Sequence, residues 1–222
     1  MQCSLFGKLP ARRDFIAIGA PREFLDAWEP WLQSAISSSR HELGKNWQSA
    51  FLRAPIWRFW LGSDICGRNV VGAFMSSLDG VGRYFPLTLF ACADDNAAIP
   101  PPELLSQDEW FDAAEDLLLS TLDHDATFES ISARVENWAA PHQENMIESN
   151  PLDLMIGTEG RTFCETFTSM RARDHHKIYA GSTFWWTVGG DAFPPVALCG
   201  KRMPDPYVFS AMLTGEFAKS SV

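Results

Sequence analysis

An eight-residue segment, residues 79–86, restricts the fold of this chain more than any other stretch. Its sequence is Asp-Gly-Val-Gly-Arg-Tyr-Phe-Pro. The two glycines allow backbone angles that other residues avoid, and Pro86 fixes its own φ and has no N–H to donate. A tight turn is therefore expected, which delivers Arg83 and Tyr84 to the start of the apolar run at residues 85–93. The chain must reverse its direction just before a buried strand.

The apolar runs on both sides of this turn predict an antiparallel sheet. Residues 56–61, 67–76 and 85–93 are strand-like and are separated by short turns, which favours a meander of neighbouring strands. Three further strands are predicted at residues 4–9, 178–188 and 194–199. Prolines beside the last of these strands indicate an edge position.

Helical periodicity predicts elements that flank this sheet. Apolar residues between Phe24 and Ile36 follow a helical repeat, with a kink or break expected at Pro30 and a stop at Gly44. Shorter helices are predicted at residues 47–53, from 106 after a Ser106–Glu109 capping box, at 128–138 and at 207–213. The expected fold class is α/β (α+β), with a largely antiparallel central sheet flanked by helices. Residues 1–222 are expected to form a single domain, and any sub-boundary would fall in the polar loop at residues 141–151.

Composition disfavours several classes of partner. The 222 residues carry a formal net charge of −10, which disfavours binding to nucleic acid or to an anionic membrane. No apolar run approaches the ~20 residues that span a bilayer, so no membrane insertion is expected. The N-terminus does not follow the pattern of a signal peptide, and the five cysteines are scattered without a C-x-x-C pair. These features predict a cytoplasmic protein with free thiols.

A search for motifs that carry chemistry finds none. The histidines form no metal-binding helix pair, and His175 and His176 are expected to face solvent in a basic loop. The chain has no G-x-S-x-G nucleophile elbow and no complete phosphate-binding loop. We therefore expect no catalytic residue, metal, cofactor or small-molecule ligand.

Two charged turns and a pair of tryptophans remain as candidate partner-binding residues. The first turn is at the end of the strand at residues 4–9 and the second is at residues 79–86. Arg83 could form a bidentate ion pair with Asp14 or Asp79, or it could point outward to a partner. Tryptophans anchor both cores and protein interfaces. The complete candidate set is Lys8, Arg12, Arg13, Asp14, Asp79, Arg83, Trp185 and Trp186.

The same residues carry a resemblance to a known family. Five sequence pieces occur in the order of that family: F-G-K-L-P with D-F at residues 6–15, F-L-D-A-W with W-L at 24–32, A-P-I-W-R-F at 54–59, the turn at 79–86, and S-T-F-W-W at 182–186. The chain resembles the TagF family, which are accessory proteins of bacterial type VI secretion systems. One departure is that Arg13 stands where the family pattern G-K-L-P-x-R-G-D-F has a glycine.

This resemblance implies a function that the residues alone do not. It implies a non-enzymatic, post-translational negative regulator of type VI secretion that binds the forkhead-associated scaffold protein of that system. It also implies a fold similar to longin (SNARE-like) domains. Two alternatives stay open: a hydrolase-type enzyme with a site near Lys8, Asp14 and Arg83, or a purely structural accessory protein of the secretion assembly.

Overall fold

The computed structural model describes residues 2–146, 160–190 and 193–217. Its centre is a seven-stranded sheet with the order β2-β1-β5-β4-β3-β8-β9, in which every neighbouring pair is antiparallel. The strands are β1 Cys3–Lys8, β2 Phe15–Ile18, β3 Trp57–Leu61, β4 Val70–Met75, β5 Leu87–Cys92, β8 Ser182–Thr187 and β9 Val196–Lys201. The expected mixed α/β fold with a largely antiparallel sheet is confirmed. Its likeness to longin domains stays a prediction.

The predicted meander is present as β3, β4 and β5, which pair in chain order. Strand β9 lies at the sheet edge, as its neighbouring prolines indicated. Strand β2 was not predicted, and it pairs with β1 to form a hairpin at the other edge. The strand expected at residues 178–188 begins later, because residues 175–178 form the short helix α7, His175–Ile178.

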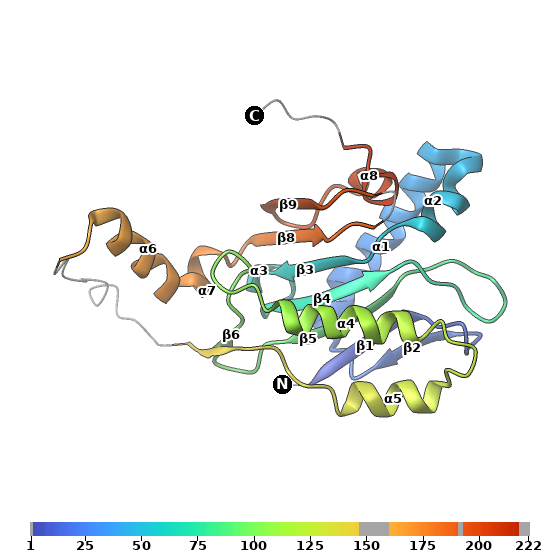
Figure 1. The fold of residues 1–222 in the computed structure, drawn as a ribbon, viewed down its shortest axis with the longest axis horizontal. Helices are drawn as coiled ribbons and strands as arrows, with labels where there is room; N and C mark the ends of the chain where they lie inside the picture. Colours follow the sequence, from blue (N-terminus) through green and yellow to red (C-terminus); the bar gives the residue numbers. More distant parts are fainter. Residues whose placement is uncertain (1, 147–159, 191–192, 218–222) are drawn as a thin grey trace.

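Helices cover both faces of the sheet. Figure 1 shows α4 (Asp108–Ser120) crossing one face and α1 (Arg22–Leu43) lying behind the other. Helix α5 (Phe128–Glu136) lies on the same face as α4 and packs against β1, and α8 (Val208–Thr214) packs against α1. The remaining short elements are η1 Gly44–Asn46, α2 Trp47–Arg53, α3 Ser63–Cys66, β6 Ala97–Ala98, β7 Glu144–Asn145 and α6 Phe163–Arg173.

Strand alternation divides the core between these two faces. On β3, Phe59 belongs to the hydrophobic cluster under α1 and α8, whereas Trp60 belongs to the cluster under α4 and α5. Successive strand side chains point to opposite faces, so a sheet covered on both sides needs apolar residues at nearly every position. Strands β3 and β4 are buried at every position and, apart from Arg58, carry no polar side chain, so they meet that requirement.

Two helix predictions need correction. The break that was one of the two alternatives expected at Pro30 is absent, because α1 continues for 22 residues to Gly44, the predicted stop, which has a φ of 50°. Pro30 lies on the exposed side, while Trp28, Trp31 and Leu32 are buried, so packing outweighs the lost hydrogen bond. The Ser106–Glu109 capping box does not form, because α4 begins at Asp108 after Gln107, whose φ of 53° is left-handed.

The segment after residue 159 also differs from its prediction. The region around Arg171 and Arg173 was expected to be a loop but forms α6, which has a capping box between Thr162 and Glu165. His175 is buried rather than facing solvent, and its Nδ1 lies 2.9 Å from the carbonyl oxygen of Ala172. Of the loop expected at residues 141–151, positions 147–151 lie outside the described residues.

Candidate partner-binding site

Sheet topology brings the two charged turns together. The loop at residues 9–14 joins β1 to β2, and the turn at residues 76–86 joins β4 to β5. Strand β1 pairs directly with β5, in a register that places Gly7 opposite Leu87. The two turns therefore meet at one end of the sheet although about 70 residues separate them in sequence.

A glycine permits this close approach. Gly7 has a φ of 134°, and a Cβ atom at this position would lie 2.0 Å from the carbonyl oxygen of Pro86. Any other residue would force the two strands apart or change the backbone. The predicted turn at residues 79–86 is also present, with Gly82 at a φ of 84°.

The carboxylate of Asp79 fixes both turns. It is fully buried, and its Oδ2 lies 2.9 Å from Nζ of Lys8 and 2.6 Å from Nε of Arg83. Its Oδ1 accepts hydrogen bonds from the backbone N–H groups of Val81 (3.1 Å) and Arg83 (2.9 Å). The side chain thus holds its own turn together and ties that turn to the end of β1.

These contacts keep Asp79 ionised. Burial by itself would raise the pKa of this carboxyl group. The hydrogen bonds from the Arg83 backbone, from the Lys8 and Arg83 side chains and from the Val81 backbone outweigh burial and hold the pKa well below its ordinary value. The site is therefore a paired, charged cluster at neutral pH.

Arg83 adopts an intermediate position between the two alternatives left open by the sequence. Its Nε binds Asp79, and its Nη2 donates a hydrogen bond to the carbonyl oxygen of Arg13. The closest oxygen of Asp14 is 4.0 Å from Nη2, so Asp79 is its main partner. The side chain is nevertheless 57% exposed. Arg83 braces the loop and also presents part of its guanidinium to solvent.

The loop at residues 9–14 is anchored by its backbone as well. The N–H of Gly80 donates to the carbonyl oxygen of Arg12 over 2.7 Å, and the Ser77 hydroxyl donates to the carbonyl oxygen of Lys8 over 2.8 Å. Arg13 has no positive φ, so the position that is glycine in the family pattern needs no special backbone angle in this chain. The side chains of Arg13 and Asp14 are exposed. The loop has a fixed path and exposed charges.

Aromatic residues extend this charged surface. Phe15 is half-exposed and packs edge-to-face on Phe85, with ring centroids 4.8 Å apart. The Arg12 guanidinium lies 4.2 Å from the centroid of the Phe128 ring and forms an ion pair with Glu129 over 3.1 Å. Residues 11–17 and Phe128 line a shallow pocket. Sequence reasoning missed Phe128 and Glu129, since only the packing of α5 against β1 brings them to the loop.

We call the exposed group Arg12, Arg13, Asp14, Phe15 and Arg83 the loop surface. The other predicted site residues lie elsewhere or are covered. Lys8 and Asp79 are buried beneath the loop surface, so the expectation that they lie on it is corrected. Trp185 is 1% exposed and stacks in the core on Trp28, with ring centroids 5.7 Å apart. Trp186 is partly buried on the other face, against Phe111 of α4.

The described residues offer little for other chemistry. Within residues 2–146, 160–190 and 193–217 there is no group of three side chains that could hold a metal ion. None of the helices in these ranges is both long and apolar enough to cross a membrane. Lys8, a residue of the hydrolase hypothesis, is already bound to Asp79.

These features define a mixed α/β protein with a charged loop fixed to one end of its sheet. Residues 4–138 match the model of the TagF N-terminal domain, type VI secretion system-associated. The chain therefore belongs to this family and has an accessory role in type VI secretion.

A solved structure agrees with this assignment. The crystal structure of PA0076 from Pseudomonas aeruginosa PAO1 is similar to this chain with a TM-score of 0.83 and 31% sequence identity. The similarity covers 100% of this chain and 98% of that one. A search of curated protein sequences gave no match.

Proposed function

We propose that this chain is a non-enzymatic, cytoplasmic negative regulator of type VI secretion, which acts after translation by binding the forkhead-associated scaffold protein through the loop surface. The observation that carries this proposal is the combination of exposed Arg13, Arg83 and Phe15 with a backbone that is already fixed from below. Arginine and aromatic side chains are the usual anchors of protein interfaces. A pre-ordered loop loses less conformational entropy on binding than a flexible one.

Charge supports the same surface. Three arginines and one aspartate give the loop surface a net positive charge, whereas the whole chain has a formal charge of −10. A local region of opposite sign orients an approaching partner and disfavours other docking positions. The complementary region on the scaffold protein is expected to be acidic.

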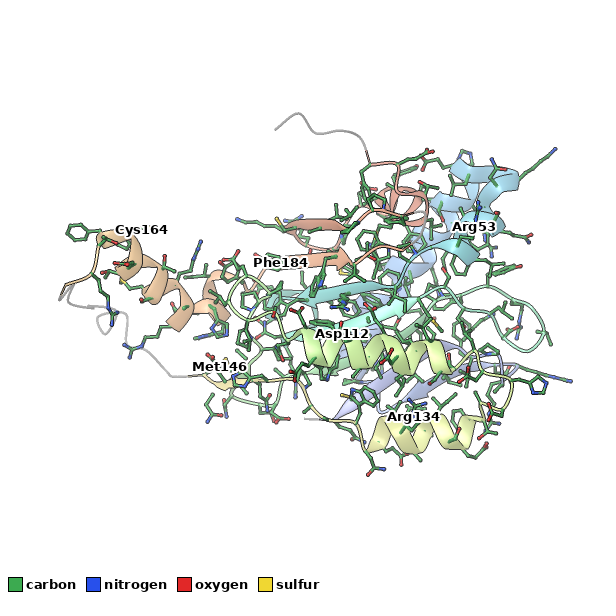
Figure 2. All side chains as sticks on the ribbon, viewed as in Figure 1. Arg53, Asp112, Arg134, Met146, Cys164 and Phe184 are labelled. Atoms are coloured by element: carbon green, nitrogen blue, oxygen red, sulfur yellow. The ribbon has the colours of Figure 1, made fainter. Side chains whose placement is uncertain are left out.

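The proposal is tested by binding of the purified scaffold protein and by a secretion assay. Arg13→Glu reverses an exposed charge whose side chain has no ion pair among the described residues, so the fold should not change. We expect at least about a tenfold loss of affinity and a loss of restraint on secretion. Arg53→Glu, on α2 (Figure 2), is the matched control and should leave both unchanged.

The two alternatives predict different outcomes. If the wild-type chain does not capture the scaffold, and deletion of its gene leaves secretion unchanged, the regulatory proposal is wrong. A hydrolase would need Lys8 or Asp14 to act on a substrate, but Lys8 is enclosed with Asp79 and Asp14 lies on the open surface. A purely structural accessory would retain its function in Arg13→Glu.

A further inference from the structure

The two edges of the sheet are β2 and β9, which Figure 1 shows on opposite sides. Strand β2 is bonded to β1 on one side, and among the described residues no other backbone segment pairs with its outer side. Edge strands usually carry a charge, a proline or a bulge that prevents further pairing. Strand β9 follows Pro195 and ends in Lys201, whereas the four residues of β2, Phe-Ile-Ala-Ile, include no such group. The outer edge of β2 is therefore open to another strand.

Hydrogen-bond direction identifies which backbone groups of β2 are free. In an antiparallel sheet the N–H and C=O of one residue point to the same neighbouring strand, and successive residues alternate. The carbonyl oxygen of Lys8 accepts a hydrogen bond from the hydroxyl of Ser77, in the turn between β4 and β5, so it points away from β2. Lys8 lies opposite Phe15, and these two residues therefore share no backbone hydrogen bond. It follows that Phe15 and Ala17 direct their N–H and C=O groups outward, while Ile16 bonds to β1.

The surface beside this edge favours an extended, acidic peptide. The shallow pocket formed by residues 11–17 and Phe128 lies along it, and the half-exposed ring of Phe15 offers an apolar contact. Arg13 forms no ion pair among the described residues, and Arg83 is 57% exposed. A small anion could bind the arginines, but it could not satisfy a row in which donors and acceptors alternate. An extended main chain supplies both kinds of group.

We propose that an extended, acidic segment of the scaffold protein adds to the outer edge of β2 as a further strand of the sheet, an inference that rests on the function proposed above. Main-chain hydrogen bonds to Phe15 and Ala17 hold the segment, and its alternate side chains provide specificity. The ring of Phe15 stacks on Phe6 of the cluster under α1, so the side chain beside it on that face should be apolar. Carboxylates near Arg13 would complement the positive charge of the loop surface.

A second copy of this chain is a less suitable occupant of the edge. Antiparallel self-pairing about the middle of β2 would place Arg13 of each copy near residues 19–21 of the other, which are uncharged. It would also bring together two molecules that each have a formal charge of −10. The charge of the loop surface therefore favours a different, acidic chain.

Hydrogen–deuterium exchange of the full chain, resolved to single amides, tests the added strand directly. The amides of Phe15 and Ala17 should exchange quickly in the free chain and at least about tenfold more slowly when the purified scaffold protein is bound. Ile16 is the internal reference and should be protected in both states. Unchanged exchange at Phe15 and Ala17 in the complex would overturn the inference. Protection in the free chain that increases with its concentration would also overturn it, because a second copy would then cover the edge.

A pair of proline variants tests the same hydrogen bonds by affinity. Ala17→Pro removes an outward N–H, which an edge strand tolerates, so we expect a retained unfolding midpoint and at least about tenfold weaker scaffold binding. Ala197→Pro is the matched control on β9. The carbonyl oxygen of Ser182 accepts from the N–H of Gly62 and so points to β3; Lys201, opposite Ser182, and by alternation Ala197 therefore face outward. The control should bind as the wild type does.

These results separate the inference from the function on which it rests. If the wild-type chain does not bind the scaffold protein, both are wrong. If Arg13→Glu abolishes binding but the wild-type complex leaves the amides of Phe15 and Ala17 unprotected, the loop surface binds through side chains and only the added strand is wrong. Equal affinity of Ala17→Pro and the wild type would also overturn the strand alone. If Ala17→Pro does not fold, exchange in the wild-type complex decides by itself.

Discussion

Replacement of Trp185 by alanine decides whether this residue acts in the core or at a partner surface. The side chain is 1% exposed and contacts several aromatic rings of the α1-side cluster. Its ring centroid lies 5.7 Å from Trp28, 4.9 Å from Trp31 and 5.5 Å from Phe59. Burial of about 150–250 Å² at ~25 cal/mol per Å² corresponds to roughly 4–6 kcal/mol for the whole ring.

One term works against this stabilisation. The indole Nε1–H is buried and has no hydrogen-bond partner among the described residues, which costs about 1–3 kcal/mol in the native state. Alanine removes that cost together with the ring but leaves a cavity. We therefore expect Trp185→Ala to lower the free energy of unfolding by about 3–5 kcal/mol. Phenylalanine fills most of the space without a polar group, so Trp185→Phe should lose only about 1–2 kcal/mol.

Urea denaturation followed by far-ultraviolet circular dichroism measures these differences, since the other eight tryptophans complicate a fluorescence signal. Trp186→Ala is the control, because that ring is only partly buried on the opposite face and should lose less than half as much. An unchanged midpoint and m-value in Trp185→Ala, with scaffold binding abolished, would refute the core assignment and restore a partner-surface role.

Three further predictions concern the charged cluster and the sheet. Gly7→Ala should lower the free energy of unfolding, measured by urea denaturation, by at least about 3 kcal/mol, because the new Cβ would lie 2.0 Å from the carbonyl oxygen of Pro86. The control Gly200→Ala places its Cβ in open space and should change stability by no more than about 0.5 kcal/mol. Similar losses in both variants would contradict the close-approach argument. The folded-state pKa of Asp79 is depressed, so the stability that this carboxylate adds to the folded protein should be complete above the unfolded-state pKa of about 4 and decline at lower pH. Asp79→Asn should therefore make stability fall less steeply with decreasing pH. An equally steep acid limb in the variant would refute this. Arg58→Met should lower the free energy of unfolding by about 2–3 kcal/mol, because it leaves the mostly buried Glu115, 2.5 Å from Arg58, without its cation. Asp112→Asn, at an exposed partner of Arg58, should lower it by less than about 1 kcal/mol. Equal losses in the two variants would contradict the role of burial.

Local signals in the sequence were sufficient for the elements of the sheet centre and for the main turn. Residues 57–61, 70–75 and 87–92 are short, mainly apolar segments bounded by turn residues, which predicts strands, and the glycines of the 79–86 segment predict the turn. Strand β2 was missed because its four residues follow three charged ones and form a strand only by pairing with β1. The break expected at Pro30 was wrong for a related reason. The free-energy cost of one proline inside the helix is smaller than the stabilisation from burying the tryptophans around it.

The candidate site was predicted in part. A tie between the loop at residues 8–14 and the 79–86 turn was one of the two alternatives that the sequence left open, and the structure brings the two together through Asp79. The direction of each side chain was not accessible, because it depends on strand register. A shift of one residue in β8 would exchange the positions of Trp185 and Trp186 between the two faces. No spacing rule in the sequence identifies which of two adjacent tryptophans is buried.

The region that matches the family model depends on residues beyond it. The match ends at residue 138, but β8 pairs along β3, and Trp185 packs against Trp28 and Trp31 of α1. Without β8, the backbone groups on one side of β3 would be unpaired and the aromatic cluster under α1 would be open to water. Strand β3 carries Arg58, which binds α4 through Asp112 and Glu115. Residues 182–187 therefore complete the packing of the family segment on the side of α1, and we expect the two parts of the chain to fold together.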